Sequence, residues 1–250
     1  MLTHKRIQYL KSLQDKKIRN RDGVFVAEGF KLVSDLISSD LNVNNVYVLE
    51  EYVDKLPFFE NIMVVSGKDM DRISGLKSPS GVFALIEIPK HKMVANDTGK
   101  KLSLALDGIQ DPGNIGTIIR TADWFGIEDI FCSENTADCY NPKVVQATMG
   151  AISKVRVHYC NLEETLGKFA SLKVPVYGTF LEGENIYSAE LSPNGIIVLG
   201  NEGRGISSCI EKTITDKLFI PPYGQNVFSD SLNVSTATAV ICSEFRRRTL

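Results

Sequence analysis

The sequence predicts an α/β protein, in which a mostly parallel sheet with helices on both faces follows a smaller α/β domain. The first observation is that short β-rich runs alternate with stretches of helical periodicity from residue 24 onwards, which is typical of βαβ units. The second is the length of 250 residues, enough for one or two domains with a proper core. The third is a polar, aperiodic stretch at residues 90–101, which predicts a linker.

The first domain is expected over residues 1–89. Its first 21 residues are basic and amphipathic. Apolar periodicity predicts a helix over 30–37, and β-branched and aromatic residues predict strands at 24–27, 46–49, 63–65 and 81–88. The second domain is expected over 102–250, with strands at 102–106, 129–132, 155–159, 174–179, 196–199 and 218–220. Its helices are expected at 114–125, 142–149, 162–172 and about 232–248.

Composition excludes several classes of protein. Apolar residues make up 43% of the chain and charged residues 23%, which is the usage of an ordinary globular protein. The five cysteines and three histidines show no metal-ligand spacing, so we expect no metal site. No apolar run approaches the roughly 18 residues that span a bilayer, and the N-terminus lacks the apolar core of a signal peptide. We therefore expect a soluble cytoplasmic protein with no membrane partner.

Positive charge gathers at both ends of the chain although the net charge is only −2. The first 21 residues hold seven basic residues against a single acid, Asp15, and the last residues include Arg246, Arg247 and Arg248. Clustered cations bind phosphates because each neutralised phosphate releases counterions. The alternative is a solvated basic helix. The candidate RNA-binding residues are Lys11, Lys16, Lys17, Arg19 and Arg21.

Polar, glycine-rich loops follow several strands of the second domain. Ligands of open parallel sheets bind beyond the carboxyl ends of the strands, which directs attention to the loops after Leu106, Thr179, Leu199 and Ile220. The loop at 107–116 leads into a helix, where Asn114 is a natural N-cap. Arg120 lies off the apolar stripe of this helix and leans back towards the loop, although a surface ion pair is the plainer interpretation.

Two further loops carry candidate functional residues. The turn at 200–207 holds one carboxylate, Glu202, among glycines that allow a close backbone approach, and it lacks the dinucleotide-binding and P-loop patterns. The segment at 220–237 ends in Ser231 and Asn233, either of which could simply cap the last helix. The small residues at the start of that helix suggest close packing, either inside the domain or against another subunit.

Taken together, the three loops resemble the signature motifs of the SpoU/TrmH family of RNA ribose 2′-O-methyltransferases, in the knotted SPOUT superfamily. Residues 111–116 with Arg120 are similar to the first motif, 199–203 to the second, and 220–235 to the third. Their order and spacing match over roughly residues 102–248. Upstream, residues 10–13 and 25–29 resemble the small substrate-binding domain, itself similar to a ribosomal protein, that many members carry.

The resemblance implies a trefoil knot, S-adenosyl-L-methionine as the cofactor and a ribose 2′-hydroxyl as the methyl acceptor. It implies a catalytic role for Arg120, as base or as stabiliser of the developing alkoxide, in a site organised by Asn114, Glu202, Ser231 and Asn233. Because an arginine is a poor base, we favour electrostatic stabilisation. The cofactor-binding residues that it implies are Thr179, Leu199, Gly200, Gly203, Ile220 and Leu232.

Two departures from the family pattern concern the substrate and the pocket rim. The stretch between Gly224 and Ser231 is about three residues longer than usual, and Gln146 stands where an arginine is common. The leading hypothesis is a homodimeric enzyme that methylates structured RNA, ribosomal rather than transfer RNA because of the basic N-terminal domain. The alternatives are a transfer RNA methyltransferase and a non-catalytic RNA-binding or ribosome-assembly factor on the same scaffold. A nucleotide-dependent α/β enzyme lacks its phosphate loop.

Overall fold

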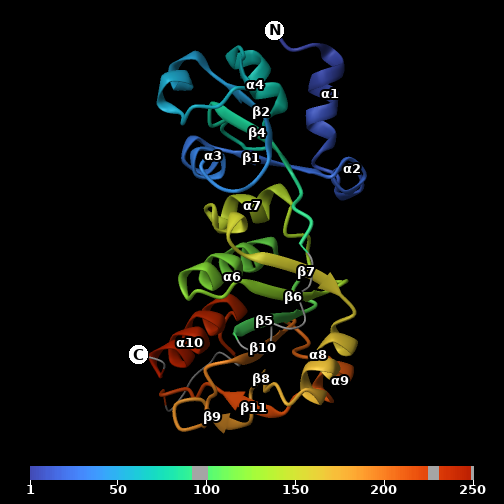
Figure 1. The fold of residues 1–250 in the computed structure, drawn as a ribbon, viewed down its shortest axis with the longest axis vertical. Coiled ribbons are helices and arrows are strands. Elements are labelled where there is room, and N and C mark those ends of the chain that lie inside the picture. The colour runs from blue at the N-terminus through green and yellow to red at the C-terminus, as the bar shows by residue number, and fades with distance from the viewer. Residues whose placement is uncertain (92–100, 225–230, 249–250) are drawn as a thin grey trace. The chain divides into compact units, whose positions relative to one another are not determined.

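A computed structural model describes residues 1–91, 101–224 and 231–248 (Figure 1). Its contacts divide the chain into two compact units. The N-terminal unit contains residues 1–90 together with 138–153, and the C-terminal unit contains 91–137 and 154–250. The expected boundary at 90–101 stays a prediction, because residues 92–100 lie outside the described ranges.

The N-terminal unit is built on a four-stranded mixed sheet with the order β1-β4-β2-β3. Its strands are β1 (Val24–Glu28), β2 (Val43–Val48), β3 (Ile62–Val64) and β4 (Val82–Glu87). β4 is antiparallel to β1 and β2, and β2 is parallel to β3. The helices are α1 (His4–Ser12), α2 (Lys16–Asp22), α3 (Phe30–Ile37), η1 (Glu50–Lys55) and α4 (Gly67–Ile73).

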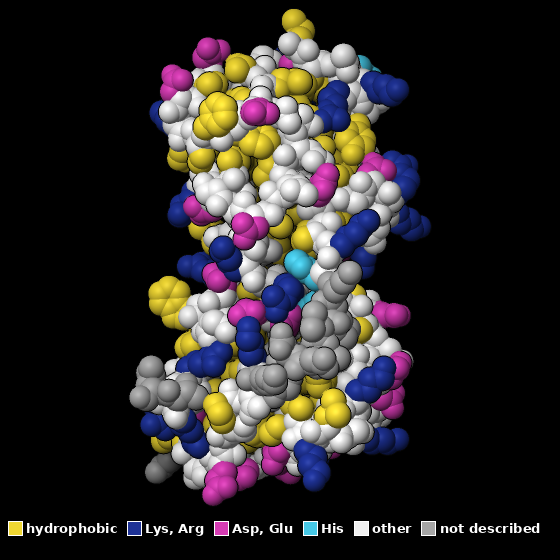
Figure 2. Space-filling view, viewed as in Figure 1, with side chains coloured by type: hydrophobic (Ala, Val, Ile, Leu, Met, Phe, Trp, Pro, Cys, Tyr) yellow, Lys and Arg dark blue, Asp and Glu magenta, His cyan; other side chains and the backbone are white. Residues whose placement is uncertain are grey.

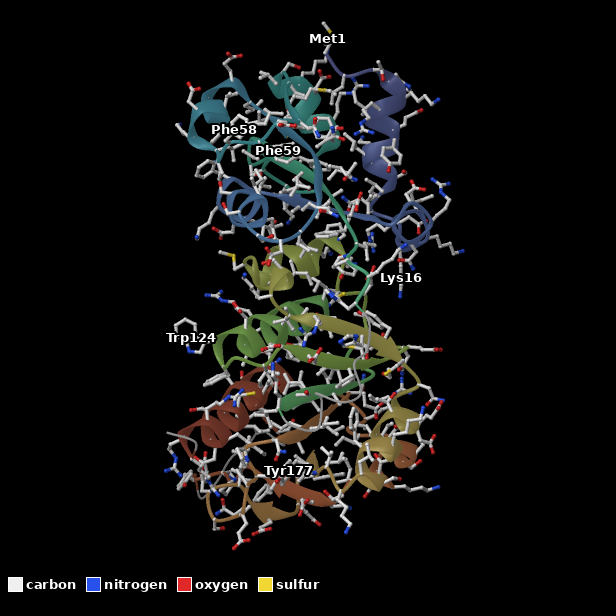
Figure 3. The ribbon with its side chains drawn as sticks, in the orientation of Figure 1. Met1, Lys16, Phe58, Phe59, Trp124 and Tyr177 are labelled. Carbon is white, nitrogen blue, oxygen red and sulfur yellow. The ribbon has the colours of Figure 1, made fainter. Side chains whose placement is uncertain are left out.

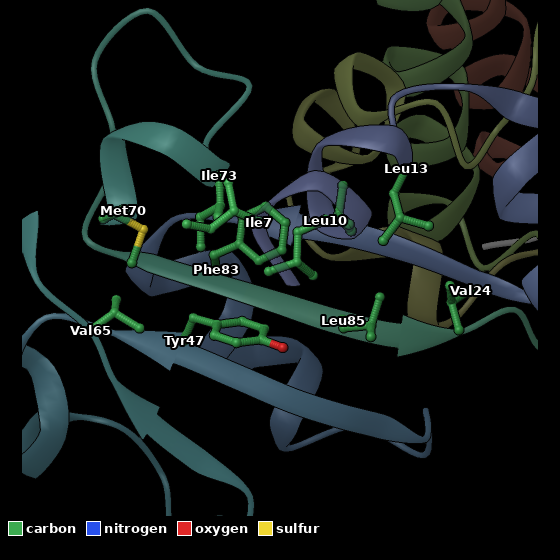
Figure 4. Close-up of a cluster of buried hydrophobic side chains, with 11 residues drawn as sticks. Ile7, Leu10, Leu13, Val24, Tyr47, Val65, Met70, Ile73, Phe83 and Leu85 are labelled. Atoms are coloured by element: carbon green, nitrogen blue, oxygen red, sulfur yellow. The ribbon is translucent and has the colours of Figure 1, made fainter. Parts of the chain in front are cut away.

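Helix α1 begins where Thr3 caps it, since the Thr3 side chain accepts a hydrogen bond from the Arg6 amide. Because Ile7 and Leu10 are three residues apart, they lie on one face of the helix, and both are buried against the sheet. Figure 4 shows them packed with residues of β2, β4 and α4, among them Tyr47 and Phe83. This cluster is the core of the N-terminal unit.

A segment from the middle of the sequence completes the N-terminal unit. Residues 138–153 leave the C-terminal unit after β6 and form α7 (Pro142–Thr148) and η2 (Ala151–Ser153). The Tyr140 and Phe25 rings lie 5.0 Å apart, and the Arg19 guanidinium is 2.5 Å from the Asp138 carboxylate. This helix was expected as an ordinary crossover of the second domain, but its contacts are with the first unit.

The C-terminal unit contains a seven-stranded sheet with the order β7-β6-β5-β10-β8-β11-β9, in which every described neighbouring pair is parallel. The strands are β5 (Leu102–Asp107), β6 (Asp129–Ser133), β7 (Arg156–Cys160), β8 (Val176–Phe180), β9 (Glu184–Asn185), β10 (Gly195–Gly200) and β11 (Asp216–Phe219). The central strands β5 and β10 are apolar and buried along most of their length, as expected of a sheet covered on both faces. The predicted α/β class with a parallel-sheet core is confirmed. The knot stays a prediction.

Helices cover both faces of this sheet. Figure 1 shows α6 (Pro112–Trp124) and α10 (Val234–Arg247) on one side and α8 (Leu162–Ser171) and α9 (Ser208–Glu211) on the other. Leu166 and Phe169 of α8 pack on Phe131 of β6 and Val198 of β10. Because all the strands run in one direction, their carboxyl ends lie along a single edge.

The helices and strands predicted for residues 102–250 all form, and their ends agree with the prediction to within two residues. The short elements α9 and β9 were not predicted, nor were η1 and α4 in the N-terminal unit. In the parts of the chain that the structure describes, no helix is long and apolar enough to cross a bilayer. Nor do the described residues contain a group of three or more His, Cys, Asp or Glu side chains that could hold a metal ion.

Candidate active site

Three segments that are distant in sequence meet at the carboxyl edge of the parallel sheet. They are the loop between β5 and α6, the turn after β10, and the start of α10. Side chains from all three are joined by hydrogen bonds, through Asn114, Glu202 and Asn233. The expectation that the three motifs converge is therefore met for these three residues.

Helix α6 starts earlier than predicted. Asp111, not Asn114, is its N-cap, and the Asp111 carboxylate accepts a hydrogen bond from the Asn114 amide at 2.9 Å. Pro112 follows at the first helical position, where its missing N–H costs nothing. The N-cap assignment of Asn114 was wrong: because Asp111 caps the helix, the Asn114 side-chain amide can bind residues of the other two loops.

Glu202 binds the first loop from the opposite side. Its carboxylate accepts a hydrogen bond from Asn114 Nδ2 at 2.9 Å and longer ones, at 3.4 Å, from the backbone N–H groups of Gln110 and Asp111. Partial burial acts to raise the pKa of Glu202, but these donors outweigh it and hold the pKa below its ordinary value. Glu202 is therefore a hydrogen-bond acceptor near neutral pH, and its charge is already engaged.

Asn233 links this pair to the last helix. Its Nδ2 donates to Asn114 Oδ1 at 3.0 Å, while its Oδ1 accepts from the amides of Ser235 and Thr236 as the N-cap of α10. The capping role and the place in the candidate site thus occur together. Since Asn114 donates to Glu202 and accepts from Asn233, its amide can take only one orientation.

The turn after β10 is closed by backbone contact. Asn201 and Gly205 exchange two backbone hydrogen bonds, at 2.8 and 3.0 Å, and the Asn201 side chain donates to Gly108 O at 2.7 Å. A Cβ on Gly200 would lie 2.3 Å from backbone atoms of Gly205 and Ile206. Only glycine fits at this strand end, which explains why the sequence has one there.

Sequence reasoning missed the residues that fix the first loop. Buried Asp107 accepts a hydrogen bond from the Ser207 amide at 2.7 Å. The hydroxyls of Ser133, the last residue of β6, and of Thr136, just after it, accept from the Gly108 amide at 2.8 and 3.2 Å. Strand-end polar residues are the only sequence signal that marks them. The loop is therefore held from both sides of β5.

The residues predicted to bind the cofactor all lie on or directly after the carboxyl ends of strands, or before α10. Thr179 donates its hydroxyl to Val198 O at 3.1 Å. The others range from buried Leu199 and half-buried Ile220 to exposed Gly203 and Leu232, the last with 51% of its surface accessible. Leu232 is thus a large apolar side chain left open at this edge.

Two predicted catalytic residues stand apart from the hydrogen-bonded cluster. Arg120 is exposed on α6, and Ser231 is exposed before α10. Within the described ranges, neither side chain makes a hydrogen bond or ion pair with the other site residues. The longer loop noted in the sequence falls on residues 225–230, which lie outside the described residues.

The predicted RNA-binding cations divide into two groups. Lys11, Lys16, Lys17 and Arg21 are exposed on α1 and α2, along the edge where Figure 2 shows Lys and Arg side chains gathered. Arg19 is only 1% accessible and donates to the Leu13 and Gln14 carbonyls as well as to Asp138. Its assignment to RNA binding is corrected, because a buried guanidinium with these partners cannot meet a phosphate.

The C-terminal arginines also have internal partners. Arg247 and Arg248 pair with buried Glu244, and Arg246 donates to the Phe125 and Gly126 carbonyls. Arg248 also donates to the carbonyls of Ile186 and Ala189. These residues fasten the end of α10, so the positive charge at this end of the chain has a structural use.

Comparisons with known proteins agree with this geometry. Residues 101–243 match the model of the SpoU rRNA Methylase family, and residues 4–84 match the MRM3-like substrate binding domain. The chain is 29% identical to the 23S rRNA (guanosine(2553)-2'-O)-methyltransferase RlmP of Bacillus subtilis, over 97% of this chain and 96% of that protein. It is 32% identical to RlmB of Pseudomonas aeruginosa, a 23S rRNA (guanosine-2'-O-)-methyltransferase, over 68% of each chain.

Solved structures show the same arrangement. A TrmH-family protein from Porphyromonas gingivalis superposes with a TM-score of 0.89 and 40% identity, covering 99% of both chains. The AdoMet-bound rRNA methyltransferase of Sinorhizobium meliloti superposes with a TM-score of 0.83 and 26% identity, covering 100% of this chain and 97% of that one. Because the family model matches residues 101–243, more than half of the chain, the chain belongs to the SpoU rRNA Methylase family.

Proposed function

We propose that this protein transfers a methyl group from S-adenosyl-L-methionine to a ribose 2′-hydroxyl of ribosomal RNA. The observation that carries the proposal is the cluster in which Asn114, Glu202 and Asn233 join three separate loops at the carboxyl edge of the sheet. A protein that only binds RNA gains nothing from a fixed amide orientation and an engaged carboxylate at this edge. The named functions of RlmP and RlmB point to the same chemistry and favour ribosomal over transfer RNA.

The residues at this edge fit the cofactor. Gly200 has no side chain at the end of β10, and the Gly203 N–H donates a hydrogen bond to Asn201 Oδ1 at 3.0 Å. Half-exposed Leu232 and half-buried Ile220 offer apolar surface for an adenine ring. Gly200, Ile220 and Leu232 would hold the adenine, with Thr179, Leu199 and Gly203 completing the pocket. When bound, the cofactor supplies an electrophilic methyl group on a sulfonium.

Arg120 supplies the charge that the hydroxyl needs. A ribose hydroxyl is a far weaker acid than any titrating side chain, so its oxygen must be stabilised while its proton passes to water or to an RNA phosphate and the methyl group leaves the sulfonium. A guanidinium stays protonated, so Arg120 acts by stabilising the developing alkoxide. Exposure leaves it available to an RNA substrate. Asn114, Glu202 and Asn233 hold the surrounding loops in position through their hydrogen bonds, and exposed Ser231 would complete the site when the substrates bind.

The N-terminal unit would bind the RNA backbone through Lys11, Lys16, Lys17 and Arg21, and the active enzyme would be a homodimer. Exposed cations on two adjacent helices suit phosphate contacts, whose strength falls as salt rises. The small residues at the start of α10 support close packing against a second copy. Sedimentation at micromolar concentration tests the dimer, and a monomer there would contradict it.

The test is methyl transfer from labelled S-adenosylmethionine to unmodified 23S rRNA, 16S rRNA and bulk transfer RNA in parallel. We expect label in one ribosomal RNA, on a ribose 2′-oxygen. Methylation there should make the adjacent phosphodiester bond resistant to alkaline cleavage. Label in transfer RNA alone would support the transfer RNA alternative. Absence of label in every RNA, together with no heat of S-adenosylmethionine binding, would favour a non-catalytic RNA-binding or assembly factor.

A further inference from the structure

The solvent-facing stripe of α6 ends in the only tryptophan of the chain. Gly113, Thr117, Arg120 and Trp124 are exposed and follow one another at intervals of three or four residues, which places them on one face of the helix. The opposite face is buried, with Ile115, Ile118, Ile119 and Ala122 in the core. The stripe thus starts beside the Asn114–Glu202 pair and reaches Trp124 by way of Arg120.

Trp124 is unusually open to solvent. Its surface is 84% accessible, and Figure 3 shows the indole standing clear of the ribbon. Single exposed apolar side chains are common on protein surfaces, so the exposure of Trp124 gains its meaning from the residues beside it on α6. The remainder of α6 is well packed, so the exposure is not a sign of a poorly folded helix end.

The spacing brings the indole close to Arg120. Four residues make about one helical turn, or about 6 Å along the axis, and side chains at this spacing are neighbours on the surface. Helical side chains lean towards the N-terminus, so we expect the Trp124 ring over the turn that carries Arg120. On the other side, the Arg246 guanidinium is anchored to the Phe125 and Gly126 carbonyls at 2.7 and 3.0 Å. Positive charge therefore lies before and after the ring.

We propose that Trp124 is a stacking site for a nucleobase of the RNA, at or next to the nucleotide whose ribose meets Arg120. The inference rests on the proposed function of Arg120. A ribose held at that guanidinium carries its base within about one helical turn, which is the spacing of Arg120 and Trp124 along α6. Unpaired bases stack on aromatic side chains in RNA recognition, whereas bases inside a duplex are shielded. The ligand is therefore an unpaired nucleotide in a loop or bulge.

The single tryptophan makes the test direct. Intrinsic fluorescence of the wild-type protein is titrated with unmodified 23S rRNA, and we expect saturable quenching as a base stacks on the indole. Loss of one base–aromatic stack should raise the KM of Trp124→Ala for this RNA by about tenfold. Trp124→Phe, which keeps a ring, should stay within about threefold. The affinity for S-adenosylmethionine should not change in either variant.

Leu172→Ala is the matched control, because Leu172 is also an exposed apolar residue of this unit, 68% accessible at the end of α8. It should behave as wild type in every assay. Bound RNA without quenching, or an unchanged KM in Trp124→Ala, overturns the proposal. The proposal is also overturned if the tryptophan fluorescence changes when the protein is diluted and Trp124→Ala sediments as a smaller species than the wild type. Those two results would place the ring in an interface between copies of the chain. Saturable quenching without methylation of any RNA would sink the proposed function but support the stacking site.

Discussion

Replacing Gly200 by alanine tests whether the turn after β10 shapes the candidate site. The added Cβ would lie 2.3 Å from the Gly205 carbonyl carbon and from the Ile206 nitrogen, well inside any real contact. Both are backbone atoms of the closed turn, so no side-chain rotation can relieve the clash. The turn itself must move, and with it Glu202 and the Asn201 side chain that holds Gly108.

The expected size follows from overpacking of a tight site, which costs about 1–3 kcal/mol. For a chain of this length, each kcal/mol lowers the Tm by roughly 2–4 °C, so Gly200→Ala should melt roughly 2–12 °C lower. Displacement of the strand end should also weaken S-adenosylmethionine binding by about tenfold or more, since about 1.4 kcal/mol corresponds to a factor of ten. Calorimetry gives the affinity, and thermal denaturation gives the stability.

Gly167→Ala provides a control of opposite sign. Gly167 lies inside α8, where a Cβ would meet nothing within 4 Å, so alanine should stabilise the helix by roughly 0.5–1 kcal/mol. Cofactor binding should be unchanged in this variant. A Gly200→Ala protein that melts and binds S-adenosylmethionine like the wild type would refute the steric reasoning and the placement of the pocket at this strand end.

Three further predictions concern charge. Arg120→Ala should abolish methyl transfer while S-adenosylmethionine binding measured by calorimetry stays within about twofold, and normal turnover would remove its assigned role. Arg19→Ala leaves the carboxylate of Asp138 without its buried partner and should lower the free energy of unfolding by about 3–5 kcal/mol in urea, whereas exposed Lys17→Ala should be neutral. Hydrogen bonds and charge from Arg247 and Arg248 lower the pKa of Glu244 to about 2. The ion pairs of Glu244 with Arg247 and Arg248 therefore stabilise the fold above about pH 4.5, and this stabilisation is lost as the pH falls towards 2. In Glu244→Gln, this loss should disappear from the pH dependence of Tm.

The parallel sheet could be predicted because each of its strands carries a local signal. Strands such as Leu102–Asp107 and Gly195–Gly200 are short apolar runs, and the helices between them have regular apolar periodicity. Short elements such as α9 and β9 have too few residues to show a period. The loop motifs identified the three segments of the site for a different reason: glycines and polar residues at strand ends mark backbone that must approach something closely.

The sequence could not predict which hydrogen-bond and ion-pair partners the polar residues have. Nothing in the local pattern distinguishes buried Arg19 from its exposed neighbours Lys16, Lys17 and Arg21, since all four are cations in one basic run. The structure separates them through Asp138, a residue 119 positions away. Likewise, the local sequence suggested that Asn114 is a helix cap. Its actual hydrogen bonds are with Glu202 and Asn233, which lie in distant loops and could not be predicted from the local pattern. Burial and hydrogen-bond partners are tertiary facts, and they decide which polar residues are structural.

The ion pair between Arg19 and Asp138 makes the segment at 138–153 a structural part of the N-terminal unit. A buried guanidinium whose donors are distributed over Leu13 O, Gln14 O and Asp138 is costly to leave unpaired, so α2 and this segment must fold together. The N-terminal unit is then incomplete without residues encoded between β6 and β7. A fragment ending at residue 90 should therefore lack stable α2, and adding residues 138–153 as a peptide should restore its protection from hydrogen exchange. Equal protection in the fragment alone would show that Arg19 has found other acceptors.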